Sequence, residues 1–379
     1  MKIGILTPYA DPEKGAPIAR ITFFKEIFVK NNIAFEIFAP KKNFNSGYFN
    51  NYYINRYKNF LELLSLIRRK KFDLLIATSP PATIIFNAAL IAKILNIPLI
   101  ADVRDPWVKS KTTVGLLKKN SPKFFLHSFY ERICYCFSNK IFVVTPEMQI
   151  VLNTELKVPE KKMVLIPHPS NLTLFNRNPV EGEKVRKELN VNNKQIILIY
   201  VGNAWVGIDQ LVRELKEPIL KSLGAKLLLI LSKEGDDKHI ESVLSEITND
   251  IKNSIHIIYN VPQDKLFRFL SAADIGLSII PDTLYYVVAS KTKEYGACSL
   301  PIACKCPKGA SFNYVMNAGI GIAETTWPDF IKSLALLIKS PEQIRLSGQN
   351  DRELMEKNYS IEAIGKKVMD TINSLKLND

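Results

Sequence analysis

Residues 2–39 read KIGILTPYADPEKGAPIARITFFKEIFVKNNIAFEIFA. The apolar run at 2–7 is typical of a buried strand, and residues 34–39 form a second such run. Between them, residues 16–30 carry apolar side chains at helical spacing: Ile18, Ile21, Phe24, Ile27 and Phe28. Strand, loop, helix and strand in this order form the βαβ unit of a parallel sheet. The stretch therefore predicts an α/β fold.

The loop between this first strand and first helix holds one glycine, Gly15. The G-x-G-x-x-G pattern of dinucleotide-binding proteins is absent, so the loop does not specify a dinucleotide. A lone glycine allows a ligand to approach the backbone closely, but it also suits an ordinary turn. Both interpretations of Gly15 stay open.

The same alternation continues along the chain. We expect helices at 57–71, 82–96, about 124–138 and 146–155, and strands at 72–77, 97–101, 141–144 and 163–166. Residues 41–57 show no clear period and are expected to be irregular. A second series follows, with helices at 181–189, 208–222, 237–250, 263–272 and 291–299, and strands at 194–201, 226–231, 254–258, 275–280, 300–303 and 319–322. Three helices near 328–339, 341–357 and 360–375 close the chain.

The two series meet at a linker that begins with Pro167-His168-Pro169 and stays polar as far as Pro179. We therefore expect an N-terminal Rossmann-like domain over 1–170 and a second over 171–355. The C-terminal helix, 356–379, is expected to pack back towards the N-terminal domain. Two such domains are expected to face each other across a ligand-binding cleft.

The charge is unevenly distributed along the 379 residues. Residues 1–175 hold 25 Lys and Arg against 12 Asp and Glu, a net +13 of the total +14. This imbalance predicts an anionic partner for the first half, either nucleic acid or an anionic membrane. In the segment 109–130, lysines alternate with aromatic and leucine residues, as in interfacial membrane helices. The alternative is a helix that buries its aromatic residues and exposes its lysines.

Other features favour a cytoplasmic protein. Lys2 leads directly into a strand, so we expect no signal peptide. The apolar stretch 82–101 is interrupted by polar residues and a proline, which favours a buried helix and strand over a membrane span. The five cysteines lack the spacing of a metal or redox site and are expected to be reduced thiols.

Two stretches carry the candidate chemistry. Residues 102–107, Asp-Val-Arg-Asp-Pro-Trp, follow a predicted buried strand, and ligands bind beyond the carboxyl ends of parallel strands. Residues 290–296, Ser-Lys-Thr-Lys-Glu-Tyr-Gly, open a predicted short helix whose free N–H groups suit an anion. Ser290 is a plausible N-cap, and Lys291 and Glu294 could bind a phosphate and a pair of sugar hydroxyls. The alternatives are a self-paired surface loop and a solvated first helical turn.

These motifs, in their order and spacing, resemble glycosyltransferase family 4, whose members are retaining, nucleotide-sugar-dependent enzymes of the GT-B fold. Residues 290–297 are similar to the family's P-S-K-x-x-E-Y-x-A motif and residues 266–277 to its L-x-x-x-L-x-x-A-D-I-G-L motif. Residues 199–202 match its Y-x-G loop. Residues 102–107 resemble the D-x-R-D-x-W of a branch that builds bacterial surface polysaccharides.

The resemblance implies roles for individual residues. Glu294 would bind the ribose hydroxyls of a UDP, GDP or dTDP sugar, and Ser290 and Lys291 would face its sugar or diphosphate. The donor-binding set is completed by Gly202, its neighbour Asn203, and Gly15. The catalytic candidates are Asp105 and Arg104, near the transferred sugar and the acceptor. No cofactor and no metal ion are expected, and the sequence has no D-x-D motif.

Some positions depart from the family pattern. The cations common after the Y-x-G loop are missing up to Arg213, Tyr286 stands where the family often has Glu, and Ala289 replaces Pro. A leaving diphosphate needs charge stabilisation, so Lys291 would carry more of that task.

The expected function is sugar transfer to a lipid-linked or polysaccharide acceptor by a protein peripheral to the inner face of the membrane. The alternatives are a non-catalytic nucleotide- or carbohydrate-binding protein of the same fold and, because of the basic half, a nucleic-acid-binding protein. The second is disfavoured because no nucleic-acid module is recognisable, so no nucleic-acid partner is expected.

Overall fold

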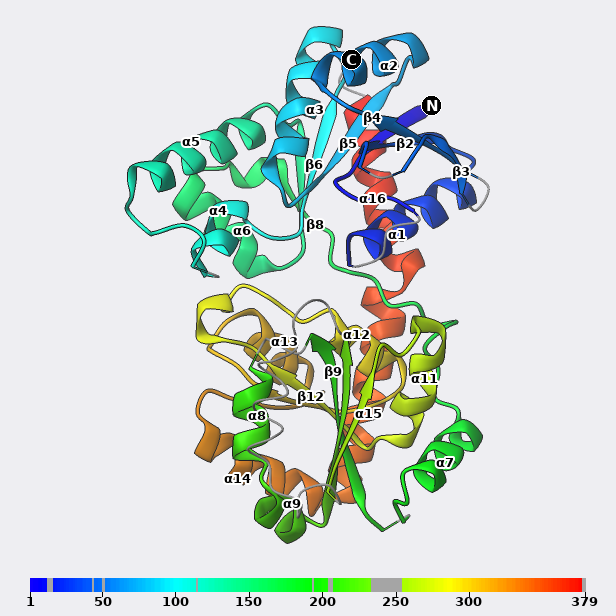
Figure 1. Ribbon diagram of the computed structural model, residues 1–379, viewed down its shortest axis with the longest axis vertical. Coiled ribbons are helices and arrows are strands. Elements are labelled where there is room, and N and C mark those ends of the chain that lie inside the picture. The colour runs from blue at the N-terminus through cyan, green and yellow to red at the C-terminus, as the bar shows by residue number, and fades with distance from the viewer. Residues whose placement is uncertain are drawn as a thin grey trace. The chain divides into compact units, whose positions relative to one another are not determined.

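The computed structural model describes residues 1–11, 16–42, 44–49, 52–113, 115–192, 194–203, 207–232 and 254–376. The chain divides into two compact units. Unit 1 comprises Met1–His168 and Ile361–Asp379, and unit 2 comprises Pro169–Ser360. The division falls inside the proline-flanked segment at 167–169, and the last helix belongs to the N-terminal unit (Figure 1).

Unit 1 is built on a sheet with the strand order β3-β4-β2-β1-β5-β6-β7-β8. All neighbouring strands are parallel except β3 and β4. The strands are β1 (Lys2–Leu6), β2 (Ala34–Pro40), β3 (Gly47–Phe49), β4 (Tyr52–Tyr57), β5 (Leu74–Ser79), β6 (Leu99–Val103), β7 (Lys140–Val143) and β8 (Met163–Leu165).

The helices of unit 1 are α1 (Ala16–Lys30), α2 (Phe60–Lys70), α3 (Ala82–Leu95), α4 (Trp107–Thr113), α5 (Pro122–Cys136), α6 (Pro146–Leu156) and α16 (Ile361–Lys376). A short 3-10 turn, Glu160–Lys162, precedes β8. Phe24 and Phe28 of α1 share one apolar core with Ile364 and Val368 of α16 and with the strands. Helix α16 therefore completes unit 1 by lying alongside α1 (Figure 1).

Unit 2 is built on a fully parallel sheet with the order β11-β10-β9-β12-β13-β14. This is the doubly wound order of Rossmann-like domains, in which the first strand lies at the centre. The strands are β9 (Ile196–Asn203), β10 (Ala225–Ser232), β11 (Ile255–Tyr259), β12 (Ile275–Ile279), β13 (Ile302–Lys305) and β14 (Gly321–Glu324).

Helices cover both faces of this second sheet, as its buried residues show. Ile197 and Ile199 of β9 pack in one core cluster, whereas Leu198 and Tyr200 pack in another on the opposite face. The helices are α7 (Pro179–Glu188), α8 (Ile208–Glu214), α9 (Glu217–Leu223), α11 (Gln263–Ala272), α12 (Lys291–Ala297), α13 (Ala310–Ala318), α14 (Trp327–Ile338) and α15 (Pro341–Leu354). A 3-10 turn, Asp282–Leu284, and a π-helical turn, Met355–Tyr359, complete the unit.

Three expectations from the sequence are wrong in detail. Part of the segment 41–57 forms β3 and β4 rather than an irregular loop. The single helix expected at 208–222 is two helices, because Pro218 at the start of α9 favours a new first turn. Strand β6 runs to Val103, so Asp102 lies within it rather than beyond it. The helix expected at 237–250 falls outside the described residues.

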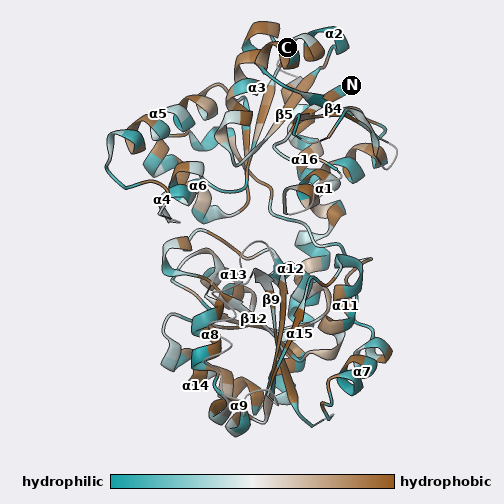
Figure 2. Cartoon of the chain, in the orientation of Figure 1, coloured by the Kyte–Doolittle hydropathy of each residue, from teal (hydrophilic) through white to brown (hydrophobic). Residues whose placement is uncertain are grey.

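Within the described residues, no helix is both long and apolar enough to cross a bilayer. The apolar stretch at 82–101 forms α3 and β6, both of which contribute to the buried core of unit 1. Figure 2 shows hydrophobic residues along the strands of both sheets.

Candidate functional site

Each sheet has a switch point, where the chain turns from building one side of the sheet to building the other. In unit 1 this point lies between β1 and β5, and in unit 2 it lies between β9 and β12. Ligands of doubly wound proteins bind beyond the carboxyl ends of the strands at this point. Candidate residues in both units follow these or neighbouring strand ends.

Asp102 is a structural residue at the end of β6. Its carboxylate and the guanidinium of Arg20 on α1 are both fully buried and 2.7 Å apart. Arg20 also donates to the carbonyls of Ile166 and Pro167, at 3.0 and 2.9 Å. The pair thus ties α1 to β6 and to the end of unit 1. Sequence reasoning missed Arg20, although a cation on the apolar stripe of α1 was the available signal.

Arg104 lies just after β6 and reaches the end of the neighbouring strand. Its Nε donates to the carbonyl of Ser79 at 3.0 Å, and its side chain is largely buried. Burial lowers the pKa of Arg104, while Asp102 and Asp105 act in the opposite direction. The guanidinium is therefore positioned at the carboxyl edge of β5 and β6.

Asp105 follows Arg104 in the turn before α4 and is partly buried. Burial raises its pKa from an ordinary 3.8 to about 6, although the neighbouring Arg104 lowers it. A carboxyl group with a pKa close to neutral can accept and release a proton under cellular conditions. Asp105 is therefore the titratable group of this segment best suited to acid–base work.

Glu131 of α5 holds this segment in place. Its buried carboxylate accepts hydrogen bonds from the backbone N–H groups of Trp107 and Val108, at 2.6 and 3.0 Å. The hydroxyl of Tyr135 donates a third, at 2.7 Å. Glu131 thus satisfies free N–H groups at the start of α4 and fixes the turn that carries Asp105. Sequence reasoning missed it, because nothing local marks an acidic residue on α5 as a cap for α4.

Tyr295 defines the corresponding edge in unit 2. Its hydroxyl accepts from the N–H of Val201 at 3.0 Å and donates to the carbonyl of Leu277 at 3.2 Å. It therefore bridges β9 and β12, the two strands on either side of the switch point. Gly276 permits this packing, because a Cβ there would lie 2.5 Å from the tyrosine ring. Tyr295 thus anchors α12 and its neighbour Glu294 to this edge.

Two carboxylates among the described residues have a buried oxygen without a hydrogen-bond partner. Asp351 is fully buried, and Lys293 is its electrostatic partner. Glu294 is the other, and part of its side chain stays exposed. One oxygen, Oε1, accepts from Lys291 Nζ at 2.8 Å. The other, Oε2, is buried and has no hydrogen-bond partner among the described residues. Burial raises the pKa of Glu294, and the nearby Lys291 opposes this effect. A buried carboxylate oxygen without a partner is costly, and a ligand hydroxyl would satisfy it.

Lys293 does not belong to the ligand-facing set. Its ammonium group lies 3.3 Å from the ring centroid of Tyr314 and 3.9 Å from that of Tyr359. Burial lowers its pKa well below the usual value, and Asp351 only partly offsets this. The interpretation of 290–294 as a solvated turn is therefore wrong for Lys293, which is a core residue held by two aromatic rings.

Ser290 precedes α12 and is exposed. Its backbone is helical and its side chain makes no capping hydrogen bond, so the N-cap expected there is not formed. Lys291, by contrast, is half-buried and paired with Glu294. Among residues 290–293, Lys291 is therefore the cation that remains partly exposed.

The glycine-containing loops are only partly described. Gly202 is the next-to-last residue of β9 and pairs with Leu231 of β10, near the carboxyl ends of both strands. The backbone of Asn203 extends that strand by one residue. Gly15 lies outside the described residues. Tyr286, in place of the family's frequent Glu, is fully buried.

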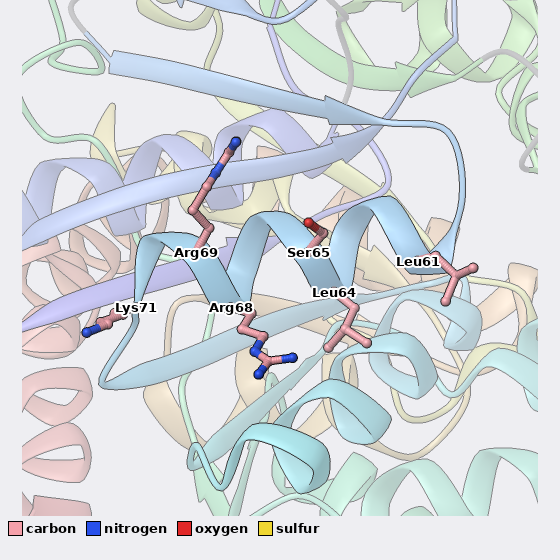
Figure 3. A pocket seen from close by; sticks show the side chains of 6 residues that line it. All are labelled: Leu61, Leu64, Ser65, Arg68, Arg69 and Lys71. Carbon is pink, nitrogen blue, oxygen red and sulfur yellow. The ribbon is translucent and has the colours of Figure 1, made fainter.

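A groove of about 520 Å³ lies elsewhere, on the surface of α2 in unit 1. It is lined by Leu61, Leu64, Ser65, Arg68, Arg69 and Lys71 (Figure 3). None of the predicted site residues lines it. Arg68 and Arg69 are in the last turn of α2, where cations stabilise the helix dipole, and this structural role accounts for them.

Within the described parts of the chain, no three His, Cys, Asp or Glu side chains gather closely enough to hold a metal ion. The cysteines there, Cys134, Cys136, Cys298, Cys304 and Cys306, are free thiols.

Comparison with known proteins identifies the kind of fold. Residues 31–174 match the family model described as Glycosyltransferase Family 4. The chain matches no curated protein sequence.

Solved structures match over the whole chain. Sucrose-phosphate synthase from Thermosynechococcus elongatus aligns with a TM-score of 0.78 and 14% identity, covering 100% of both chains. The Anabaena protein HepE in complex with UDP aligns with a TM-score of 0.73 and 12% identity, covering 99% of this chain and 100% of that one. A glycosyltransferase from Rickettsia africae aligns with a TM-score of 0.69 and 15% identity, covering 100% of this chain and 99% of that one. The α/β fold is therefore of the GT-B type, and the resemblance to glycosyltransferase family 4 is supported.

Proposed function

We propose that this GT-B glycosyltransferase moves a sugar, with retention of configuration, from a nucleotide-sugar donor to a lipid-linked or polysaccharide acceptor in cell-surface glycan synthesis. The observation that carries the proposal is Glu294, whose buried Oε2 has no hydrogen-bond partner among the described residues. It lies beside Tyr295, which bridges β9 and β12 next to the switch point of unit 2. This is where a nucleotide is held in doubly wound domains.

Unit 2 would bind the donor. The free Oε2 of Glu294 would accept from ribose hydroxyls, and Lys291 Nζ would move from Glu294 Oε1 towards the diphosphate. Ser290 and the backbone at Gly202 and Asn203 would complete the donor site. Structures of Anabaena HepE have been solved with UDP and with UDP-glucose, which supports a nucleotide sugar as the ligand class.

Unit 1 would contribute the groups for the acceptor. In the reaction, the bond between the sugar's anomeric carbon and the phosphate oxygen breaks, and the electron pair leaves with the diphosphate. An acceptor hydroxyl oxygen bonds to that carbon and gives its proton to the carboxylate of Asp105. Asp105, with a pKa raised to about 6, is a carboxylate at neutral pH and can accept a hydrogen bond from that hydroxyl. Arg104 would orient the sugar or acceptor. No metal ion or cofactor is part of this proposal.

The test is ligand-induced stabilisation of the full chain, because a ligand that binds only the folded state raises its melting temperature. UDP, GDP, dTDP and ADP and their sugars are compared on wild type, Glu294→Gln and the control Glu342→Gln. Glu342 is an exposed carboxylate in the first turn of α15 in the same unit. We expect one nucleotide class to stabilise wild type and the control, with an affinity at least tenfold lower for Glu294→Gln. Equal stabilisation of all three proteins would contradict the assignment of Glu294.

A second candidate function is nucleotide binding without transfer. It is favoured by the burial of Lys293 and by the lack of a cation between Gly202 and Arg213 in the sequence, which leave Lys291 as the cation of the 290–294 segment for a leaving diphosphate. Such a protein would be stabilised by a nucleotide sugar but would neither hydrolyse it nor transfer the sugar. Release of the nucleoside diphosphate, measured with candidate acceptors, distinguishes the two functions.

A further inference from the structure

Helix α5 of unit 1 has two faces of different character. Its inner face carries Glu131, Cys134 and Tyr135, which are buried. Tyr130 packs against Phe86 of α3, with ring centroids 4.7 Å apart, and His127 stacks on Trp107 of α4 at 5.0 Å. This inner face attaches α5 firmly to the unit and, through Glu131, to the turn that carries Asp105.

The outer face of α5 is apolar although it lies at the surface. Phe125, Leu126 and Phe129 are 60%, 65% and 62% exposed. These residues follow the helical spacing of one face. Leu116, in the connection before α5, is 78% exposed. Large apolar side chains gathered in this way on one element indicate a binding surface, whereas scattered single ones would not.

The segment that carries this face is basic, although its Lys109 is paired with Glu155 of α6. Between Pro106 and Tyr130 the sequence has five lysines and no acidic residue. Lys118, Lys119 and Lys123 are exposed beside the apolar side chains, and Arg132 is exposed further along α5. Unit 1 as a whole carries 28 Lys and Arg against 15 Asp and Glu. Figure 2 shows hydrophilic and hydrophobic residues mixed along α5.

Aromatic and leucine side chains surrounded by lysines are complementary to the interface of an anionic bilayer, where rings enter the acyl boundary and ammonium groups meet phosphates. The aromatic residues of α5 are divided between the two sides of the helix. Tyr130 packs inward, whereas Phe125 and Phe129 do not.

We propose that the outer face of α5, with Leu116 and the lysines at 118, 119 and 123, docks unit 1 on an anionic membrane by inserting Phe125, Leu126 and Phe129. This inference rests on the proposed function for its purpose, since a lipid-linked acceptor would be met at the same surface. Glu131 would then link the docked helix to the turn that carries Asp105, since it accepts hydrogen bonds from Trp107 and Val108.

The test is co-sedimentation of the full chain with vesicles of phosphatidylcholine, with and without phosphatidylglycerol, and needs no donor or acceptor. We expect strong binding only to the anionic vesicles, decreasing with added salt. The double variant Phe125→Ser/Phe129→Ser should lose at least tenfold in partition coefficient. The triple variant Lys118→Gln/Lys119→Gln/Lys123→Gln should lose more, since each lysine near an anionic surface contributes about fivefold.

The groove on α2 supplies matched controls in the same unit. Leu61 is 73% exposed, and Arg68 and Arg69 are exposed. Leu61→Ser removes one exposed apolar side chain, and Arg68→Gln/Arg69→Gln removes two charges, in both cases away from α5. Each should change the partition coefficient less than threefold. Equal losses in the α2 and α5 variants would show that vesicle binding depends only on the overall charge of the protein, and would overturn the proposal.

Other occupants of the surface give different results. A second copy of the chain would appear as a concentration-dependent dimer that Phe125→Ser/Phe129→Ser abolishes, with no vesicle binding, and would overturn the proposal. Melting curves of the same variants, with and without nucleotide, separate the membrane-surface proposal from the proposed function. Vesicle binding without any nucleotide response supports the membrane surface and contradicts the proposed function, whereas the reverse supports the function and contradicts the surface.

Discussion

Asp102 of unit 1 and Glu294 of unit 2 are both carboxylates from the predicted site stretches. They differ in how many of their oxygens accept hydrogen bonds from the protein. Both oxygens of Asp102 accept from Arg20, inside the core of unit 1. Glu294 is also shielded from water, yet only Oε1 has a partner, and that partner, Lys291, is partly exposed. The local sequences do not reveal this difference, since both carboxylates lie in charged stretches next to an apolar strand.

The comparison separates a structural carboxylate from one that is ready for a ligand. A buried ion pair in which both carboxylate oxygens accept hydrogen bonds stabilises a specific arrangement and leaves neither oxygen without a partner. A buried carboxylate with an unsatisfied oxygen lowers stability until something donates to it. Asp105 resembles Glu294 in this respect, because burial also destabilises its charged form.

The largest expected effect is on stability and comes from Asp102→Asn. The change removes the charge that compensates Arg20, which is fully buried among Phe23, Phe24 and the end of β6. Breaking a buried pair from one side costs about 3–5 kcal/mol, so the free energy of unfolding should fall by that amount. Urea unfolding monitored by circular dichroism measures it. A loss below about 1 kcal/mol would remove the distinction drawn between Asp102 and Glu294.

Asp105→Asn should have the opposite sign. Because the folded-state pKa of Asp105 is raised to about 6, the folded protein holds the proton between about pH 4 and pH 6 while the unfolded chain does not. Wild type therefore loses stability as pH rises through this window. The variant lacks this penalty and should be more stable than wild type by up to about 3 kcal/mol above pH 6, with little difference near pH 4.

The measurement is urea unfolding of wild type and Asp105→Asn across the pH range, with sugar transfer followed on the same samples. We expect the variant to gain stability and to lose turnover. If the difference in stability between wild type and variant does not vary with pH, the pKa of Asp105 is not raised in the folded protein. Unchanged turnover would remove it from the catalytic candidates.

Glu131→Gln should cost about 1–3 kcal/mol of stability, because an amide has one acceptor oxygen and leaves a buried N–H of Trp107 or Val108 unpaired. A structural role alone would change only stability. A role in positioning the Asp105 turn predicts that kcat also falls, at conditions where the variant is fully folded, while nucleotide affinity stays within twofold. Tyr135→Phe is the control, since it removes the third hydrogen bond and leaves the two backbone contacts in place.

The sequence predicts the fold well because local patterns determine it. The bounds expected for α1, 16–30, agree with the structure, since an apolar stripe at helical spacing depends only on neighbouring residues. In the segment 41–57, tyrosines that favour strands were outweighed in the prediction by asparagines that favour turns, and β4 was missed. The position expected for Arg104 and Asp105, beyond the carboxyl end of a buried strand, agrees with the structure, whereas Asp102 lies inside that strand.

The individual roles within each stretch could not be predicted, because they depend on partners that are distant in sequence. Lys293 is buried by Tyr314 and Tyr359, and Asp102 is paired with a residue 82 positions away. The charged residues of the 290–294 segment therefore look alike in the sequence, although Lys293 is a core residue and Lys291 is accessible.

The smallest expected effect on stability is that of Glu294→Gln. The change removes a charge whose pKa burial already raises, and the amide can still accept from Lys291. The free energy of unfolding without ligand should therefore change by less than about 1 kcal/mol, since the loss of the ion pair offsets the relief of a buried charge. In saturating nucleotide the difference from wild type should widen, because the ligand stabilises only the protein that binds it. Urea unfolding of wild type and variant, with and without the nucleotide, measures the two differences in free energy. A loss of several kcal/mol without ligand would place Glu294 with Asp102 as a structural carboxylate, and the donor site would then have to be sought elsewhere on the same sheet edge.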